Sequence, residues 1–475
     1  MTRIKHLTID GKPVATDEHF DVYNPSTGEV FDQAPSASLE QLDEAMDSAN
    51  EAFRSWKLDD DFRVSKLREL AKAMTDSTAE IAADLSIENG KTATNAAFEP
   101  AVSAAWLDYY AGLELPSEVL RDDDEALVKV ERRPMGVVGA ITPWNMPVAL
   151  AFWKIAPALR AGNTVVLKPS PFTPFSSLRF GQIASEILPP GVLNVVTGGD
   201  ELGAAITTHP TPRKISFTGS VASGKKVAVS AAADLKRVTL ELGGNDPAII
   251  LDDVDVDAIA QQLYWGAMFN NGQGCVLVKR VYAHERIHDQ LVEALAALAK
   301  ATVVGDPAQV KDAALGPLAT KFQAERVAEL TAAAVSGGAR VAAGGKRMDS
   351  PGYFFEPTIL YGLEDGARIV DEEQFGPSLP IISYTDVDDA IARANATNFG
   401  LGASVWSADE ERGRGIASQI NAGTTWINTH AVLPPDVPFG GRGWSGIGLE
   451  NGPWGMLSFM DMQVVHTSRS GGGLA

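Results

Sequence analysis

The feature that most restricts the fold of this chain is a regular alternation of apolar strands and helices between residues 136 and 242. Runs such as 164–167 and 214–217 are predicted strands, and segments with helical spacing, such as 148–160, separate them. This alternation is typical of a parallel sheet with helices on both faces. We therefore predict an α/β protein with a doubly wound, Rossmann-like sheet, followed by a second α/β unit in which 249–251 and 280–283 are strands.

Composition excludes several classes of function. The 475 residues carry a net charge of −21, and binding to nucleic acid or to an anionic membrane surface needs a basic face. No run approaches the ~18–20 uninterrupted apolar residues of a membrane span. We expect no nucleic-acid or membrane partner. The seven His show no metal-ligand spacing, so we expect no metal, and a single cysteine gives no disulfide framework, so we expect a cytoplasmic protein.

That single cysteine, Cys275, ends the segment 269–275. Taken alone, a lone thiol is more often buried packing than a nucleophile. Its neighbours Gly272 and Gly274 favour the second interpretation, because Gly permits positive φ and a close approach of the backbone to a ligand. Cys275 is therefore a candidate nucleophile, provided that partners exist elsewhere in the chain.

Four predicted strands end in unusual polar residues. Asn145, between two prolines, is either a turn residue or an amide donor for a developing oxyanion. Lys168 could reach a phosphate or a ribose. Ser220 follows a Gly and opens a helix, which could hold a diphosphate. Glu241 lies between two Leu, and desolvation there would raise its pKa towards use as a general base.

These stretches, in this order and spacing, resemble the aldehyde dehydrogenase superfamily. The resemblance covers residues 10–465 and adds a cofactor domain, a catalytic domain and a β-ribbon for oligomerisation to the expected fold. The motifs that carry it are 143–147, 217–220, 240–244, 269–275, 372–377 and 438–441.

The resemblance implies a role for each catalytic candidate. Cys275 would attack the aldehyde carbon, while the Asn145 amide and the Cys275 backbone N–H hold the oxyanion. Hydride transfer would leave a thioester, and Glu241 would activate water to release a carboxylic acid. Lys154 and Glu450 match positions proposed for proton transfer in some members.

The resemblance also implies a nicotinamide cofactor. Lys168 would bind the adenosine ribose, Ser220 the diphosphate and Glu373 the nicotinamide ribose, with Phe375 packed beside it. Pro171 stands where many NAD-preferring members carry Glu, so we expect NAD and allow NADP. The complete set assigned to the cofactor is Thr142, Trp144, Lys168, Ser170, Gly219, Ser220, Glu373 and Phe375.

The same resemblance divides the chain. Residues 1–119 and 135–242 would form the dinucleotide-binding domain and 243–460 the catalytic domain. Residues 120–134, read as a charged break and an exposed strand, would join 461–475 in an oligomerisation ribbon and tail, with 470–473 disordered. We expect a homodimer or a homotetramer.

Positions that match the family's substrate tunnel are apolar or aromatic and include no Lys or Arg. This composition favours a neutral, aliphatic or aromatic aldehyde over one that carries a carboxylate. The positions are Met146, Trp153, Phe269, Leu433 and Phe439.

Three alternatives stay open. A CoA-acylating semialdehyde dehydrogenase would resolve the thioester with CoA, but that route needs no base like Glu241. A catalytically retired structural protein on the same fold would have no reason to retain Cys275, Asn145 and Glu241 together. A thiol hydrolase without nucleotide lacks a His close to Cys275 in the sequence.

Overall fold

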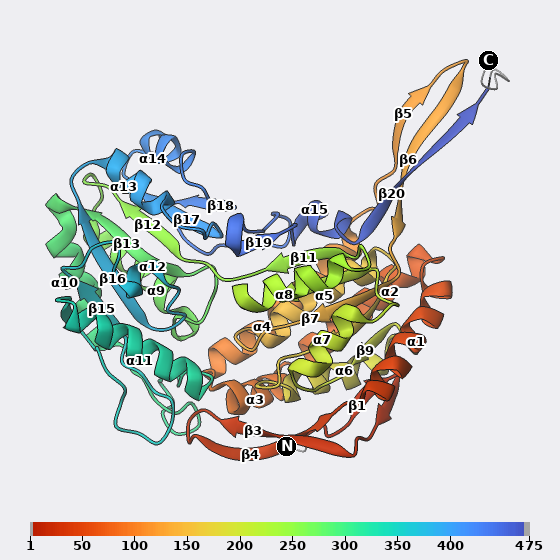
Figure 1. Cartoon of the computed structure of the whole chain (residues 1–475), viewed down its shortest axis with the longest axis horizontal. Coiled ribbons are helices and arrows are strands. Elements are labelled where there is room, and N and C mark those ends of the chain that lie inside the picture. The colour runs from red at the N-terminus through yellow and green to blue at the C-terminus, as the bar shows by residue number, and fades with distance from the viewer. Residues whose placement is uncertain (1–2, 470–475) are drawn as a thin grey trace.

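The computed structural model describes residues 3–469 and has two α/β lobes side by side, with a long ribbon projecting from one of them (Figure 1). The lobe that carries both the N-terminal half and the ribbon contains an eight-stranded sheet, with the order β19-β11-β10-β7-β8-β9-β1-β2. Its strands are β1 Leu7–Ile9, β2 Lys12–Val14, β7 Val137–Ile141, β8 Thr164–Lys168, β9 Leu193–Val195, β10 Lys214–Thr218, β11 Arg237–Glu241 and β19 Gly446–Ile447.

The predicted alternation of strands and helices is confirmed in this sheet. The five strands β7 to β11 run parallel, and β1, β2 and β19 add antiparallel pairs at the two ends. The helix between β8 and β9 ends at Ser185, shortly before a pair of prolines at 189–190. The helices between these strands are α5 Pro147–Arg160, α6 Phe175–Ser185, α7 Asp200–Thr208 and α8 Val221–Ala232.

The second lobe contains a seven-stranded sheet with the order β14-β15-β16-β13-β12-β17-β18. All neighbours in it are parallel except β14 and β15. Its strands are β12 Asp246–Ile250, β13 Val278–His284, β14 Arg340–Ala343, β15 Thr358–Tyr361, β16 Ser378–Tyr384, β17 Gly402–Trp406 and β18 Thr424–Ile427. Its helices are α9 Val256–Met268, α10 Glu285–Ala301, α11 Lys321–Ser336, α12 Arg368–Asp371, α13 Val387–Asn395 and α14 Glu410–Ala417.

The projecting ribbon is a three-stranded antiparallel sheet made of β5 Glu118–Asp122, β6 Ala126–Pro134 and β20 Met460–Ser468. The expectation that 120–125 is only a charged break was wrong in part, since β5 extends to Asp122. Every residue of β5 is exposed, so solvent compensates its charges and the strand can form. The expected disorder at 470–473 lies outside the described residues, and the domain limits stay a prediction.

The N-terminal segment adds a hairpin and four helices to the first lobe. The first of these helices begins with a capping box, in which the Ser38 side chain accepts from Gln41 N and the Gln41 side chain accepts from Ser38 N. The helix α4, which the sequence did not predict, is rich in Ala and lacks a clear polar face. These elements are β3 Glu18–Asn24, β4 Glu29–Ser36, α1 Leu39–Trp56, α2 Asp60–Asp76, α3 Thr78–Asn89 and α4 Ala93–Gly112, and the short α15 Gly452–Leu457 packs on α5.

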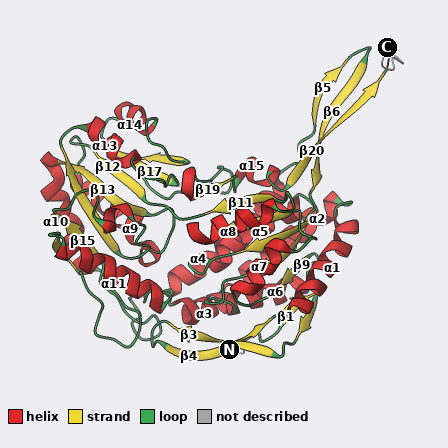
Figure 2. Ribbon diagram, in the orientation of Figure 1, coloured by secondary structure: helices red, strands yellow, loops and turns green. Residues whose placement is uncertain are grey.

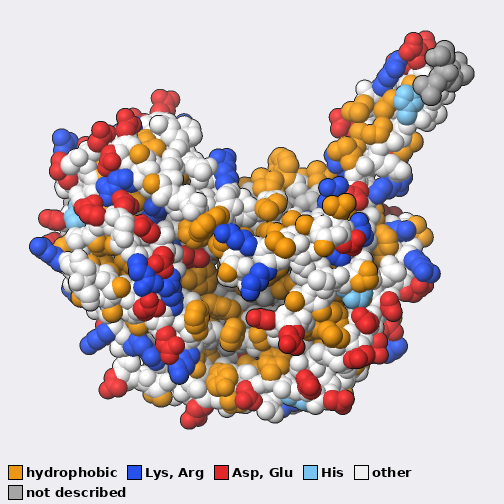
Figure 3. Space-filling view, in the orientation of Figure 1, with side chains coloured by type: hydrophobic (Ala, Val, Ile, Leu, Met, Phe, Trp, Pro, Cys, Tyr) orange, Lys and Arg blue, Asp and Glu red, His pale blue; other side chains and the backbone are white. Residues whose placement is uncertain are grey.

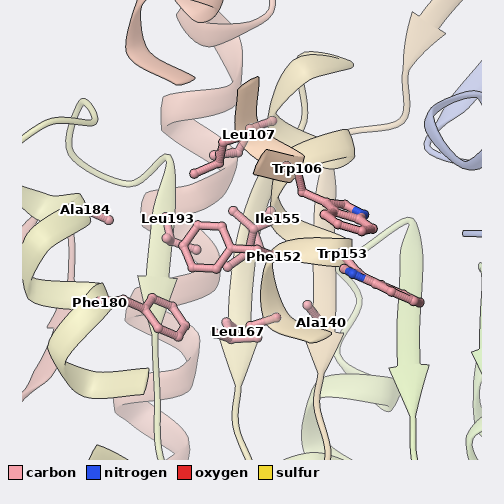
Figure 4. Close-up of a cluster of buried hydrophobic side chains, with 14 of the residues drawn as sticks. Trp106, Leu107, Ala140, Phe152, Trp153, Ile155, Leu167, Phe180, Ala184 and Leu193 are labelled. Atoms are coloured by element: carbon pink, nitrogen blue, oxygen red, sulfur yellow. The ribbon is translucent and has the colours of Figure 1, made fainter. Parts of the chain in front are cut away.

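The core of the first lobe lies between the sheet and helices α4, α5 and α6 (Figure 4). Figure 2 shows the same helices covering the sheet. Every residue of α5 is buried; Phe152 packs edge-on against Phe180, and Trp153 stacks on Trp106 with ring centroids 5.5 Å apart. A helix held this firmly fixes the position of the loop that precedes it. Among residues 3–469, no helix is long and apolar enough to cross a membrane.

Candidate active site

The polar residues predicted at strand ends meet at one edge of the eight-stranded sheet. Its parallel strands pair in a register that sets Ile141 of β7 opposite Lys168 of β8, and Thr218 of β10 opposite Glu241 of β11. Carboxyl ends of parallel strands form the usual ligand-binding edge of such a sheet. Asn145 follows β7 and Ser220 follows β10, so the four predicted polar residues share that edge.

The second lobe supplies the thiol to this edge. After α9 the chain forms a short 3₁₀ turn in which Asn270 and Asn271 have φ of 49° and 60°. Gly272 has φ +69°, and a Cβ built there would lie 2.3 Å from the carbonyl oxygen of Gly376. Only Gly fits this position, as the sequence suggested. The turn delivers Cys275, which is partly exposed, to the junction of the two lobes.

Two hollows meet at Cys275. One is a cavity of about 370 Å³ and the other a cleft of about 290 Å³, and Asn145, Thr218 and Cys275 line both. Figure 3 shows hydrophobic side chains gathered between the two lobes on this face. All five residues predicted to line a substrate tunnel, Met146, Trp153, Phe269, Leu433 and Phe439, line the larger cavity.

The amide of Asn145 is buried and directed at the loop that carries the thiol. Its Nδ2 donates to the carbonyl oxygen of Gln273 at 3.0 Å. An amide nitrogen carries two hydrogens, so one is held by this bond and the second is available to a substrate oxygen beside Cys275.

Glu241 lines the larger cavity, and neither of its buried carboxylate oxygens has a hydrogen-bond partner among the described residues. Burial raises its pKa well above the usual value, the charge of Glu450 raises it further, and Lys154 opposes both. Lys154 Nζ is itself 2.5 Å from Glu450 Oε1 and 2.7 Å from Thr218 Oγ1. A carboxyl with this environment is suited to accept a proton near neutral pH.

The thiol of Cys275 is kept protonated in the free protein. Burial raises its pKa to about 12, and the nearby carboxyls of Glu373, Glu241 and Asp246 add to that effect, whereas Lys279 lowers it. Only the thiolate is a strong nucleophile. Attack by Cys275 therefore requires that a bound molecule or a base stabilise the thiolate.

The smaller cleft contains five of the eight residues assigned to the cofactor. Ser220 caps α8, a helix of twelve residues, by accepting from Ser223 N at 3.2 Å. Glu373 Oε1 accepts from Gly244 N at 3.0 Å, and burial raises the pKa of Glu373 to about 7. A helix N-terminus and a carboxylate fit a diphosphate and a ribose respectively. The five cleft residues are Trp144, Gly219, Ser220, Glu373 and Phe375.

The other three, Thr142, Lys168 and Ser170, are buried at the same sheet edge but do not line the cleft. Lys168 Nζ donates to Pro169 O at 3.2 Å, and burial lowers its pKa to about 8, with Asp200 opposing. Its remaining hydrogens are available for a ligand. Lys168 is the last residue of β8, while Thr142 and Ser170 follow β7 and β8, so all three lie one to two strands away from the β10–α8 connection.

Two residues that hold the loops around the cleft, Gln323 and Lys279, were not identified from the sequence. Gln323 Nε2 donates to the carbonyl oxygens of Gln374 and Phe375, both at 2.8 Å, and so holds Phe375 at its φ of 50°. Lys279 Nζ donates to the carbonyl oxygens of Gly272 and Gly274 in the thiol loop, at 3.0 and 2.5 Å. Lys279 lies beside Arg280 in β13, between apolar residues of the strand, and this pair of cations in a strand was the available signal. Within residues 3–469, no group of three or more potential ligands is arranged to hold a metal ion.

Comparison with known proteins supports the same interpretation. The model of the aldehyde dehydrogenase family matches residues 13–465. An aldehyde dehydrogenase named LUC3 from a Fusarium species is 38% identical over 97% of this chain and 98% of its own length. An aldehyde dehydrogenase from Bacillus cereus, solved as an NAD+ complex, has a TM-score of 0.95 and 34% identity, covering 98% of this chain and 97% of its own. An NADP-dependent enzyme from E. coli also has a TM-score of 0.95 and 34% identity, covering 98% of each chain.

The fold and the pair of hollows around a single thiol thus define an NAD(P)-dependent oxidoreductase. This chain belongs to the aldehyde dehydrogenase family, and it oxidises aldehydes.

Proposed function

We propose that this enzyme oxidises neutral aliphatic or aromatic aldehydes to carboxylic acids through a thioester on Cys275. The observation that carries the proposal is the position of Cys275 where an apolar cavity meets a polar cleft. An aldehyde in the cavity would have its carbonyl carbon at the thiol and its apolar body against aromatic side chains. Among the described residues that line the cavity there is no Lys, Arg or His, so a substrate carboxylate would lack a counter-charge.

The first half of the reaction forms and oxidises a thiohemiacetal. The Cys275 thiol gives its proton to a water molecule, the thiolate attacks the aldehyde carbon, and the carbonyl becomes an oxyanion held by the second hydrogen of Asn145 Nδ2 and by the Cys275 backbone N–H. A nicotinamide in the cleft supplies the hydride acceptor. Loss of the hydride leaves an acyl group bonded to the sulfur of Cys275.

The second half hydrolyses the thioester. Glu241 takes a proton from a water molecule, the resulting hydroxide attacks the acyl carbon, and the thiolate of Cys275 leaves with the formation of a carboxylic acid. The raised pKa of Glu241 and its two unpartnered oxygens suit this role. The bonded groups Lys154, Thr218 and Glu450 would carry the proton onward.

We propose NAD as the preferred cofactor, with NADP also accepted. Pro171 supplies no carboxylate to repel a 2′-phosphate, and Lys168 keeps unshared hydrogens that could donate to either a ribose hydroxyl or a phosphate. We also propose self-association through the ribbon, where Val119, Leu120, Met462 and Val464 are exposed hydrophobic residues. The cytoplasm is the compartment proposed from cysteine usage.

The test is absorbance at 340 nm with benzaldehyde, hexanal and succinate semialdehyde, each with NAD and with NADP. We expect turnover with the two neutral aldehydes that is lost in Cys275→Ala, while cofactor binding persists. Preference for succinate semialdehyde would contradict the proposed substrate class. Turnover that requires CoA would replace hydrolysis by acyl transfer to CoA.

A further inference from the structure

The connection between α3 and α4 lies against the loop that carries Asn145, although no sequence motif assigns it a function. Gly90 ends α3 with φ +80°, and this turn directs the side chains on either side of it inward. Asn89 Nδ2 donates to Trp144 O at 2.6 Å, and Lys91 Nζ donates to Asn145 O at 2.8 Å. Two consecutive carbonyl groups of the Asn145 loop are therefore held by one short segment.

Lys91 also reaches the loop that carries the thiol. Its Nζ donates to Asn270 Oδ1 at 2.6 Å and lies 3.3 Å from Glu99 Oε1. Both ions are buried, with side-chain exposure of 1% for Lys91 and 0% for Glu99. Glu99 in turn accepts through Oε2 from the backbone N–H groups of Val148 and Ala149 at 2.9 and 3.1 Å, in the first turn of α5.

Asn270 transmits the effect of Lys91 to the oxyanion donors. Because its Oδ1 accepts from Lys91, its Nδ2 faces the carbonyl oxygens of Asn145 and Gln273, at 3.0 and 3.3 Å. The carbonyl of Gln273 is also the acceptor that orients the Asn145 amide. Only Gly274 lies between Gln273 and Cys275, and its carbonyl, which shares a planar peptide unit with the Cys275 N–H, accepts from Lys279 Nζ at 2.5 Å. With the Gln273 and Gly274 carbonyls both held, the direction of the Cys275 N–H is set.

The Lys91–Glu99 pair is unusual because of where its hydrogen bonds go. Among the described residues, the hydrogen-bond partners of both side chains belong to the Asn145 loop, to the first turn of α5 or to Asn270. A buried ion pair is weak evidence for stability, since apolar replacement of both partners is often neutral or stabilising. The hydrogen bonds of this pair converge on the Asn145 loop with the adjoining turn of α5 and on the loop that contains Asn270. This distribution indicates that the pair positions these loops.

We propose that the buried Lys91–Glu99 pair is a positioning device that fixes the Asn145 amide and the Cys275 backbone N–H relative to each other, so that both donate to one oxyanion. Neither residue touches the reacting atoms, so both act through Asn145 and Asn270. The inference rests on the proposed function of Asn145 and Cys275. It predicts a specific defect in the steps that develop negative charge on the substrate oxygen.

The experiment compares three single variants, Lys91→Met, Asn145→Ala and Arg160→Met, with the charge-free double variant Lys91→Met/Glu99→Gln. Arg160 is the matched control, because it is a buried cation at the opposite end of α5, bonded to Asp60 and to Leu113 O. The readouts are kcat and KM for hexanal with NAD, cofactor Kd, thermal unfolding, and the rate of alkylation of Cys275 by iodoacetamide.

We expect Lys91→Met to lower kcat roughly 10- to 100-fold, somewhat less than the ~10²–10³-fold effect of deleting an oxyanion donor. Cofactor Kd and the alkylation rate should stay within about twofold, since neither depends on the oxyanion. The variant Lys91→Met/Glu99→Gln should lose kcat to the same extent, although no unpaired charge is buried in it. Arg160→Met should change unfolding but leave kcat within about twofold.

A double variant supplies the decisive comparison. If Lys91 acts in part through Asn145, Lys91→Met should slow Asn145→Ala by less than it slows the wild-type enzyme. Losses that multiply would overturn the inference, and so would wild-type kcat in Lys91→Met and in Lys91→Met/Glu99→Gln. If Lys91→Met fails to fold, the charge-free double variant decides alone by the same kcat criterion; should that variant also fail to fold, the pair is structural and the inference is wrong. Full activity in Asn145→Ala would instead remove the proposed function on which the inference rests.

Discussion

The two hollows that meet at Cys275 differ in the polarity of the side chains that line them. The larger cavity is walled by Trp, Phe, Leu and Pro side chains, and its ionisable groups, Glu241, Glu450 and Cys275, lie where the chemistry is proposed. The cleft on the other side presents the N-terminus of α8, the carboxyl of Glu373 and the guanidinium of Arg326. This difference leads us to expect that recognition of the aldehyde rests on apolar contact, while recognition of the cofactor depends more on hydrogen bonds and charge.

This division has a physical basis. An apolar wall gains free energy from almost any hydrophobic body, at roughly 25 cal/mol per Å² buried, so it discriminates weakly between aldehydes of similar size. Directed hydrogen bonds discriminate strongly, because a poor match leaves buried polar groups unpaired. We therefore expect a broad aldehyde range combined with a strict requirement for a nicotinamide dinucleotide. Substitutions in the aldehyde cavity should leave the affinity for the cofactor unchanged. Substitutions in the cofactor cleft should leave the KM for the aldehyde unchanged.

The largest loss of activity is expected from a substitution of Glu241, at the boundary between the cavity and the cleft. Glu241→Gln keeps the shape of the side chain but removes its basicity, so deacylation should slow by ~10²–10⁴-fold. The first turnover should still release one equivalent of NADH per active site, because hydride transfer precedes hydrolysis. Stopped-flow absorbance at 340 nm measures both phases. Loss of the first turnover together with the steady state would place Glu241 before the thioester.

The next effect concerns the cofactor side alone. Burial raises the pKa of Glu373 to about 7, so its carboxylate forms as the pH rises through that value. Affinity for NAD should therefore increase between pH 6 and pH 8, as the acceptor for the ribose hydroxyls becomes charged. Glu373→Gln should weaken binding about tenfold and abolish the pH dependence, with KM for hexanal unchanged. Fluorescence titration measures the Kd, and a pH dependence that persists in the variant would exclude Glu373 as its source.

A smaller effect is expected on the aldehyde side. Leu433→Ala removes apolar surface from the larger cavity, and at ~0.8 kcal/mol per buried methylene the KM for hexanal should rise by about tenfold. Acetaldehyde, which is too short to cover the wall, should be almost unaffected. The Kd of NAD serves as the control. An equal loss for both aldehydes would show that Leu433 supports the loop rather than the substrate.

The smallest effect is expected from Pro171→Glu. A carboxylate near Lys168 should repel a 2′-phosphate, so kcat/KM with NADP should fall several-fold while that with NAD is unchanged or improved. The ratio of the two specificity constants is the measurement. An unchanged ratio would indicate that position 171 does not face the adenosine ribose, which agrees with its place in a separate surface groove beside Phe172.

The sequence predicted the first sheet and its functional edge well because both depend on local patterns. Four strand-ending polar residues could be recognised from apolar runs and turn residues alone, and the parallel register then set Thr218 level with Glu241. The long helices α4, α9 and α11 were not predicted. In α4 the small apolar residues show almost no amphipathic pattern, so burial on several sides left no periodic signal.

The supports of the site were hidden for a different reason. Lys91 and Asn270 are 179 residues apart in the chain, and Lys91 is 54 residues from Asn145. Contacts of this range follow from the packing of helices against loops, not from any spacing in the sequence. A charged residue next to a helix-ending Gly was a weak signal, because solvent-exposed lysines are common in such positions. Only its burial distinguishes Lys91.

Covalent catalysis by Cys275 is tested most directly by mass spectrometry of Glu241→Gln after reaction with hexanal and NAD. We predict that the mass of the protein increases by that of one hexanoyl group, that this group maps to the peptide containing Cys275, and that one equivalent of NADH is formed. Because Cys275 is the only cysteine in the chain, a thioester can form at no other residue. Production of NADH without an acylated Cys275, in a variant that does not turn over, would contradict covalent catalysis by this thiol.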